Sequence, residues 1–162
     1  MSKWLSWAIL LSSFFLIFQG LFAQKQAPPA SFPQFKFYDL ATKPFVNSQL
    51  RPGLPTVVYY FDPDCDHCQL QAKMVSGEIN SFSQINQLWV STAEEANIKA
   101  FQQKYFATAK TPIFFVRDKD YKFDSFFGYS VAPTILVFGK NGAFAKKFTN
   151  EIAPVEIRNL AK

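Results

Sequence analysis

The sequence predicts a three-layer α/β domain in which a mixed central sheet lies between layers of helices. Residues 56–61 (TVVYYF) are an uninterrupted β-branched and aromatic run, which is typical of a strand buried on both faces. Further strand-like runs alternate with helical patterns along the chain. Lys140-Asn141-Gly142, placed between two apolar runs, indicates a closing β-hairpin.

The first elements are a hairpin, a loop and the buried strand. Two short runs at 35–40 and 43–46 flank Ala41-Thr42 and predict an N-terminal β-hairpin. Residues 47–55 form a loop in which Pro52-Gly53 marks a turn. The strand at 56–61 then ends at Asp62-Pro63-Asp64.

Two strand and helix units follow. After the cysteines, apolar residues recur at helical spacing and predict one face of an amphipathic helix, at Leu70, Met74, Val75, Ile79 and Phe82. A strand is expected at 87–90. The spacing of Thr92 and Glu95 resembles a capping box. It predicts a helix whose apolar face carries Ala96, Ala100, Phe101 and Tyr105.

The last third of the chain predicts strands at 113–116, 134–138 and 143–148. A short helix is expected within 118–127 and ends at Gly128. Pro154 opens the last helix, because its missing N–H is not needed in a first turn.

The N-terminal stretch is typical of a secretory signal. Residues 1–23 contain Lys3, then an apolar run, then Ala23 as a small residue for cleavage. In the alternative, residues 4–22 are retained as a membrane tether. Residues 24–33 are rich in Pro, Ala and Gln and are expected to be a linker. The domain proper is then 34–162, and an exported, periplasmic location is predicted.

Composition excludes some function classes. The 162 residues suit one domain, and the net charge of +5 comes from scattered lysines, so no nucleic-acid partner is expected. Both cysteines and the single histidine lie in FDPDCDHCQL, residues 61–70. Haem attachment would need a histidine at Gln69. A zinc site would need a second ligand pair, so neither a metal nor another cofactor is predicted.

Cys65 and Cys68 would make a poor structural disulfide, because so short a loop removes little entropy from the unfolded chain. In an exported α/β chain, C-x-x-C where a strand gives way to a helix is a redox signal. The helix N-terminus favours a thiolate at Cys65, and His67 is expected to tune the pKa of Cys65 in the same direction. The nearby aspartates oppose this effect. Cys65 is thus the attacking sulfur, and Cys68 resolves the mixed disulfide.

TVVYYFDPDCDHC and the later YSVAPTILVF together resemble the thioredoxin superfamily, and PQFKFYDLATKPFVNSQL is similar to the N-terminal hairpin of its exported TlpA/ResA-like members. The resemblance implies a thioredoxin-like α/β/α sandwich with an exposed Cys65 and a buried Cys68. It further implies a cis peptide bond before Pro133. The main chain of Ala132 would pair with an extended substrate segment.

The sequence departs from the family pattern near the cysteines. Asp64 replaces the common tryptophan, and Tyr59 and Tyr60 occupy positions where many thioredoxins have a buried acid. His67 resembles the oxidising members of the superfamily, whereas the hairpin resembles the reducing ones.

The resulting prediction is an extracytoplasmic thiol–disulfide oxidoreductase that exchanges disulfides with protein cysteines, with the reductase direction preferred. A membrane redox partner would recharge the dithiol. The alternatives are a periplasmic disulfide oxidase or isomerase, and a non-catalytic binding module with the same fold.

Overall fold

The computed structural model describes residues 26–162 and confirms the mixed α/β architecture. Its centre is a seven-stranded sheet with the order β2-β1-β5-β4-β3-β6-β7. The strands are β1 (Lys36–Asp39), β2 (Pro44–Val46), β3 (Thr56–Tyr60), β4 (Asn86–Ser91), β5 (Ile113–Arg117), β6 (Thr134–Phe138) and β7 (Phe144–Phe148). The predicted signal peptide, residues 1–23, lies outside the described residues.

Three parallel strands form the middle of the sheet, because β4 pairs with β3 on one side and with β5 on the other. The β6–β7 hairpin continues the sheet antiparallel to β3, and the β1–β2 hairpin extends it beyond β5. Tyr60 at the end of β3 pairs with Thr134 at the start of β6. The chain that follows β3 therefore meets the chain that precedes β6 at one edge of the sheet.

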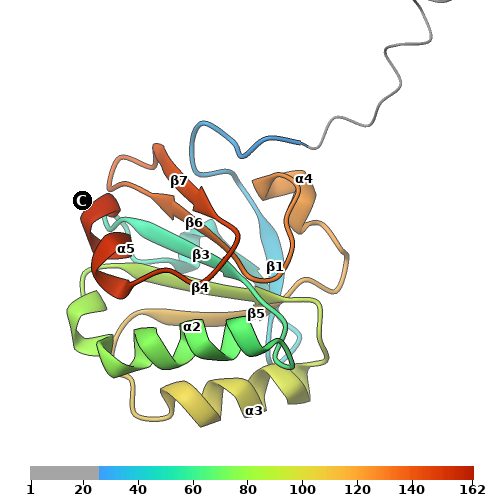
Figure 1. Cartoon of the computed structure of the whole chain (residues 1–162). Helices are drawn as coiled ribbons and strands as arrows, with labels where there is room; N and C mark the ends of the chain where they lie inside the picture. Colours follow the sequence, from blue (N-terminus) through green and yellow to red (C-terminus); the bar gives the residue numbers. More distant parts are fainter. Residues whose placement is uncertain (1–25) are drawn as a thin grey trace, which may run out of the picture.

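Helices cover both faces of the sheet (Figure 1). The helices α2 (Asp66–Gly77) and α3 (Glu95–Phe106) lie side by side on one face, together with α5 (Pro154–Leu160). The short helix α4 (Phe123–Phe127) packs on the opposite face. These layers match the predicted sandwich.

Each face of the sheet has its own apolar core. The α2-side core includes Tyr59, Phe61, Cys68, Ala72, Val75, Trp89, Ile98, Phe101, Phe115, Ile135 and Ile157. The α4-side core includes Phe35, Phe37, Phe45, Val58, Leu88, Val90, Phe123, Phe127, Leu136 and Phe138. Most of the phenylalanines between residues 26 and 162 thus fill the two cores, as is usual for large apolar side chains.

The predicted apolar face of the first helix is wrong in part. Leu70 is exposed, and α2 ends at Gly77, so that Ile79–Phe82 form a separate 3-10 turn. The buried face instead carries Cys68, Gln71, Ala72 and Val75. The buried amide of Gln71 finds hydrogen-bond partners on a distant segment, which the local pattern of apolar residues could not indicate.

The capping box predicted for the next helix is also wrong. The helix α3 begins at Glu95, its N-cap is Glu94, and no side chain caps it. The side chain of Thr92 is hydrogen-bonded to Tyr60 instead. The buried face of α3 carries Ile98, Phe101 and Phe106, whereas Ala96 and Ala100 are exposed.

Residues 26–33, expected to form most of a linker, lie against the domain. The Ala30 carbonyl accepts a hydrogen bond from the Phe144 N–H (3.0 Å), and the Phe32 N–H donates to the Gly142 carbonyl (2.7 Å). The Phe32 ring packs against Phe138. In the part of the chain from residue 26 onward, no helix combines the length and the apolar character needed to cross a membrane.

Candidate dithiol site

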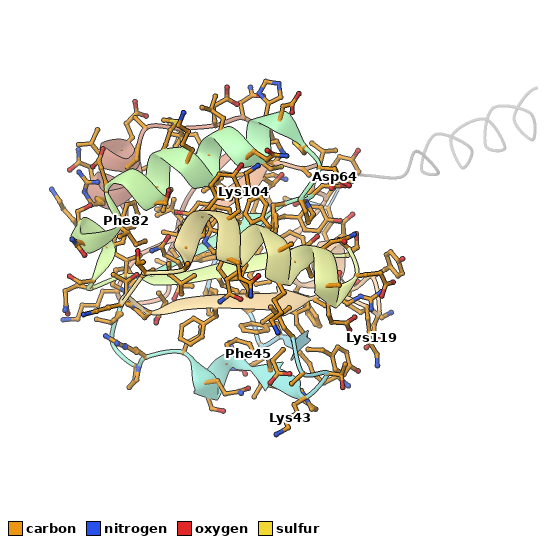
Figure 2. The ribbon with its side chains drawn as sticks, turned by 90° about the horizontal axis from the view of Figure 1, so that it is seen from below. Lys43, Phe45, Asp64, Phe82, Lys104 and Lys119 are labelled. Atoms are coloured by element: carbon orange, nitrogen blue, oxygen red, sulfur yellow. The ribbon has the colours of Figure 1, made fainter. Side chains whose placement is uncertain are left out.

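A tight turn connects β3 to the helix that carries the two cysteines. The Asp62 carboxylate accepts a hydrogen bond from the Asp64 N–H (2.9 Å), and the Asp62 carbonyl accepts one from the Cys65 N–H (3.2 Å). Figure 2 shows Asp64 at this end of α2 and Phe82 beyond the other end. The turn therefore places Cys65 at the helix N-terminus, on the edge of the sheet where β3 ends.

Cys65 is the N-cap of α2, and its sulfur accepts a hydrogen bond from the Cys68 N–H (3.4 Å). Both cysteines are free thiols in this structure. Cys65 is partly exposed, whereas Cys68 is 1 % exposed and belongs to the α2-side core. Only Cys65 is therefore open to a bulky disulfide-bonded partner.

The surroundings of Cys68 keep it protonated. Burial raises the pKa of the Cys68 thiol above its ordinary range, and its hydrogen bond with the Cys65 sulfur raises this pKa further. A hydrogen bond from the main-chain N–H of Asp62 acts in the opposite direction but does not prevail. Cys68 therefore remains a thiol at neutral pH.

Alkaline pH is expected to destabilise the reduced protein through this thiol. An unfolded cysteine loses its proton above about pH 8.5, while folded Cys68 keeps it. The unfolded state then binds fewer protons, so the free energy of unfolding falls by about 1.4 kcal/mol per pH unit until folded Cys68 ionises too. Urea unfolding of reduced wild type and reduced Cys68→Ser, from about pH 7 to 10, measures the difference. Equal slopes for the two proteins would contradict the expectation.

Pro133 lies at the start of β6, next to the end of β3 in the sheet register. The Ala132–Pro133 peptide bond is cis, as the resemblance implied. Pro133 is buried, and Ala132 and Cys65 both pack against the α2-side core. Val131, which directly precedes Ala132 in the chain, is exposed. The chain from 131 to 133 thus reaches the same edge of the sheet as the cysteines.

His67 lies on the first turn of α2 and contacts a residue far along the chain. Its Nδ1 is 2.8 Å from Oε2 of Glu151, and its side chain is 65 % exposed. The Glu151 carboxyl has a lowered pKa because its own main-chain N–H and then His67 stabilise the charged form. The sequence motif indicated His67, whereas nothing around Glu151 in the sequence marked it.

Tyr59 and Trp89 belong to the α2-side core, which also includes Cys68. Their rings stack with centroids 4.0 Å apart, and neither the Tyr59 hydroxyl nor the Trp89 Nε1 has a hydrogen-bond partner. Burial raises the pKa of Tyr59 well above its ordinary range. Tyr59 is therefore protonated at neutral pH and offers no anionic base for the proton of Cys68.

Two contributors to this site could not be found from sequence. Gln71 and Glu151 are ordinary polar residues in the sequence. Gln71 lies on α2, and only the packing of the loop between β7 and α5 against α2 gives it a partner and brings Glu151 to His67. Within residues 26–162, no three His, Cys, Asp or Glu side chains are grouped so as to hold a metal ion.

No protein-family model matches the sequence, and no curated protein matches it either. Solved structures match in fold. The MTB protein DsbF, solved in mixed oxidised and reduced forms, aligns with a TM-score of 0.66 and 22% identity over 83% of this chain and 97% of its own. A secreted Mycobacterium tuberculosis disulfide oxidoreductase homologous to E. coli DsbE gives a TM-score of 0.62 and 20% identity, covering 79% and 92%.

A putative thioredoxin from Neisseria meningitidis has a TM-score of 0.64 and 20% identity, covering 81% of this chain and 87% of its own. At these identities the comparisons establish the fold. The chain has the fold of the thioredoxin superfamily, as its motifs suggested.

Proposed function

We propose that this chain is an extracytoplasmic thiol–disulfide oxidoreductase that reduces disulfides of client proteins with the Cys65–Cys68 pair. One observation carries the proposal: a partly exposed cysteine caps the helix, and a buried cysteine touches it from one turn further along. The buried thiol is held protonated, so the two sulfurs have different tasks. The structures with the same fold include named disulfide oxidoreductases, which supports this class of reaction.

The reaction transfers two electrons to the client. The Cys65 thiolate attacks one sulfur of the client disulfide, so that a Cys65–client bond forms and the client's own S–S bond breaks. The displaced client thiolate takes the proton of Cys68. The Cys68 thiolate then attacks the sulfur of Cys65 and releases the second client thiolate, which is protonated by solvent. The products are a Cys65–Cys68 disulfide and a client dithiol.

The client is expected to bind as an extended segment beside residues 131–133. The exposed side chain of Val131 offers an apolar contact, and the main chain of Ala132 offers hydrogen bonds at the edge where Cys65 lies. The oxidised enzyme needs an external dithiol to return it to the reduced form. A membrane-bound dithiol donor suits an exported enzyme.

The test is the equilibrium of the dithiol with glutathione or dithiothreitol, read by trapping free thiols, together with the reduction of insulin. A reduction potential near or below about −250 mV, with insulin reduction, supports a reductase. His67 favours the second candidate, a disulfide oxidase, which a potential of about −200 to −120 mV would support. A dithiol that cannot be cycled would overturn both and leave a binding module.

A further inference from the structure

The loop between β7 and α5 is fixed to the dithiol helix by contacts from two of its residues. The Gln71 side chain pairs with the main chain of Ile152: Oε1 accepts from the Ile152 N–H (2.7 Å), and Nε2 donates to the Ile152 carbonyl (3.2 Å). The neighbouring Glu151 carboxylate lies 2.8 Å from Nδ1 of His67. His67 and Gln71 are one helical turn apart, so both point to the same loop.

These contacts fix the position of the Glu151 carboxylate, so His67 is the more mobile partner of the two. Gln71 is 1 % exposed, and its two hydrogen bonds set the position of the main chain next to Glu151. The Glu151 side chain is 27 % exposed, against 65 % for His67. A histidine this exposed would otherwise be free to change its rotamer. Glu151 therefore holds the imidazole by Nδ1, on the side of α2 that faces the last loop.

This arrangement bears on the charge near Cys65. A protonated imidazole stabilises a neighbouring thiolate, and stabilising the reduced form makes a dithiol more oxidising. An imidazolium paired with a carboxylate is a neutral unit and exerts a weaker field. The other ionisable side chains near Cys65 in the stretch 61–70 are the exposed carboxylates of Asp62, Asp64 and Asp66. Within residues 61–70, His67 is the one side chain able to carry a positive charge, and the nearest cation bonded from outside is Lys104, whose Nζ donates to the Gln69 amide oxygen (3.0 Å).

We propose that Glu151 is a positioning residue that holds His67 away from Cys65 and so keeps the dithiol reducing. The proposal rests on the function proposed above and concerns the direction of electron flow between the dithiol and its client. It explains how a motif with a histidine, which favours oxidation, suits a reductase. Without the carboxylate, the imidazolium is free to pair with the Cys65 thiolate and to stabilise the reduced form.

The experiment measures the dithiol equilibrium of the full chain with a dithiothreitol redox buffer near pH 6, where an ordinary imidazole is largely protonated. Glu151→Gln is expected to shift the equilibrium toward the reduced form about tenfold, which equals about 30 mV for a two-electron couple. Glu156→Gln is the matched control, because it removes an exposed carboxylate, whereas the carboxylate paired with His67 is that of Glu151. Its shift is expected to stay within about twofold, or roughly 9 mV.

A double-variant cycle separates positioning from simple charge. In a His67→Gln background, Glu151→Gln is expected to change the equilibrium by less than about twofold, because its effect passes through the imidazole. An undiminished tenfold effect there would overturn the proposal in favour of a direct field on the sulfur. A Glu151→Gln shift no larger than that of Glu156→Gln would overturn it as well.

The ring of His67 gives an independent readout, because it is the only histidine in the chain. The ¹⁵N signals of the neutral ring are expected to report a proton on Nδ1 in the wild type and a mixture of tautomers in Glu151→Gln. Identical signals in the two proteins would contradict the positioning role. Insulin reduction is measured on the same samples: wild type that fails to reduce insulin, with the shift intact, would defeat the proposed function and leave this inference standing.

Discussion

Replacing Cys68 by serine is expected to turn the enzyme into a trap that stays covalently joined to its client. Cys65 still attacks the client disulfide, but no second sulfur follows to release the product. The turnover of insulin reduction should fall by about a thousandfold or more, because the paired cysteines act as a unit. A mixed disulfide should accumulate that is visible on non-reducing gels and disappears with dithiothreitol. Cys65→Ser should lose the same activity without forming the complex.

Two controls keep this result interpretable. Serine places a hydroxyl in the apolar core at the position of Cys68, which costs about 1–3 kcal/mol, so Cys68→Ala provides a variant without the polar group. Serine at position 65 is a good N-cap and should leave the helix intact. If Cys65→Ser formed the trapped complex and Cys68→Ser did not, the roles assigned to the two sulfurs would be reversed.

Replacing Trp89 by alanine is expected to cost about 3–5 kcal/mol of unfolding free energy. The side chain is 1 % exposed, and its ring packs against Tyr59, Phe61 and Phe115. The missing indole leaves a cavity in the core that also holds Cys68. Urea unfolding followed by far-ultraviolet circular dichroism measures the change.

Trp89→Phe is the matched control for this substitution. It keeps an aromatic ring in the stack, and it removes an indole N–H that has no hydrogen-bond partner. We therefore expect a cost of about 1 kcal/mol, because the loss of ring volume is offset by the removal of an unsatisfied buried donor. A cost for Trp89→Ala no greater than that of Trp89→Phe would show that the core closes around the vacated space.

The sequence predicted the sheet well because its strands carry strong local signals. The run TVVYYF and the turn at Asn141-Gly142 each specify one backbone conformation, and both were found where expected. The positions of the helices along the chain were predicted, but the side of each helix that is buried was not. Leu70 faces solvent while Gln71 is buried, since the partner of Gln71 comes from the other end of the chain.

The same limit applies to the candidate site. Cys65 and Cys68 form a local motif whose spacing singled them out, and Pro133 was expected from the resemblance to the thioredoxin superfamily. Glu151 has no motif around it. It reaches His67 only because the loop after β7 folds back over α2, and a single sequence contains no record of such a contact.

The docking of residues 26–33 has a consequence for the order in which the chain is completed. The partners of this segment include Gly142, Ala143 and Phe144, which leave the ribosome long after it. Contacts that are distant in sequence form late, because a large loop must first be closed. Cys65 and Cys68, separated by two residues, are able to meet much earlier. The two sulfurs are thus able to meet before residues 26–33 have docked on the β6–β7 hairpin.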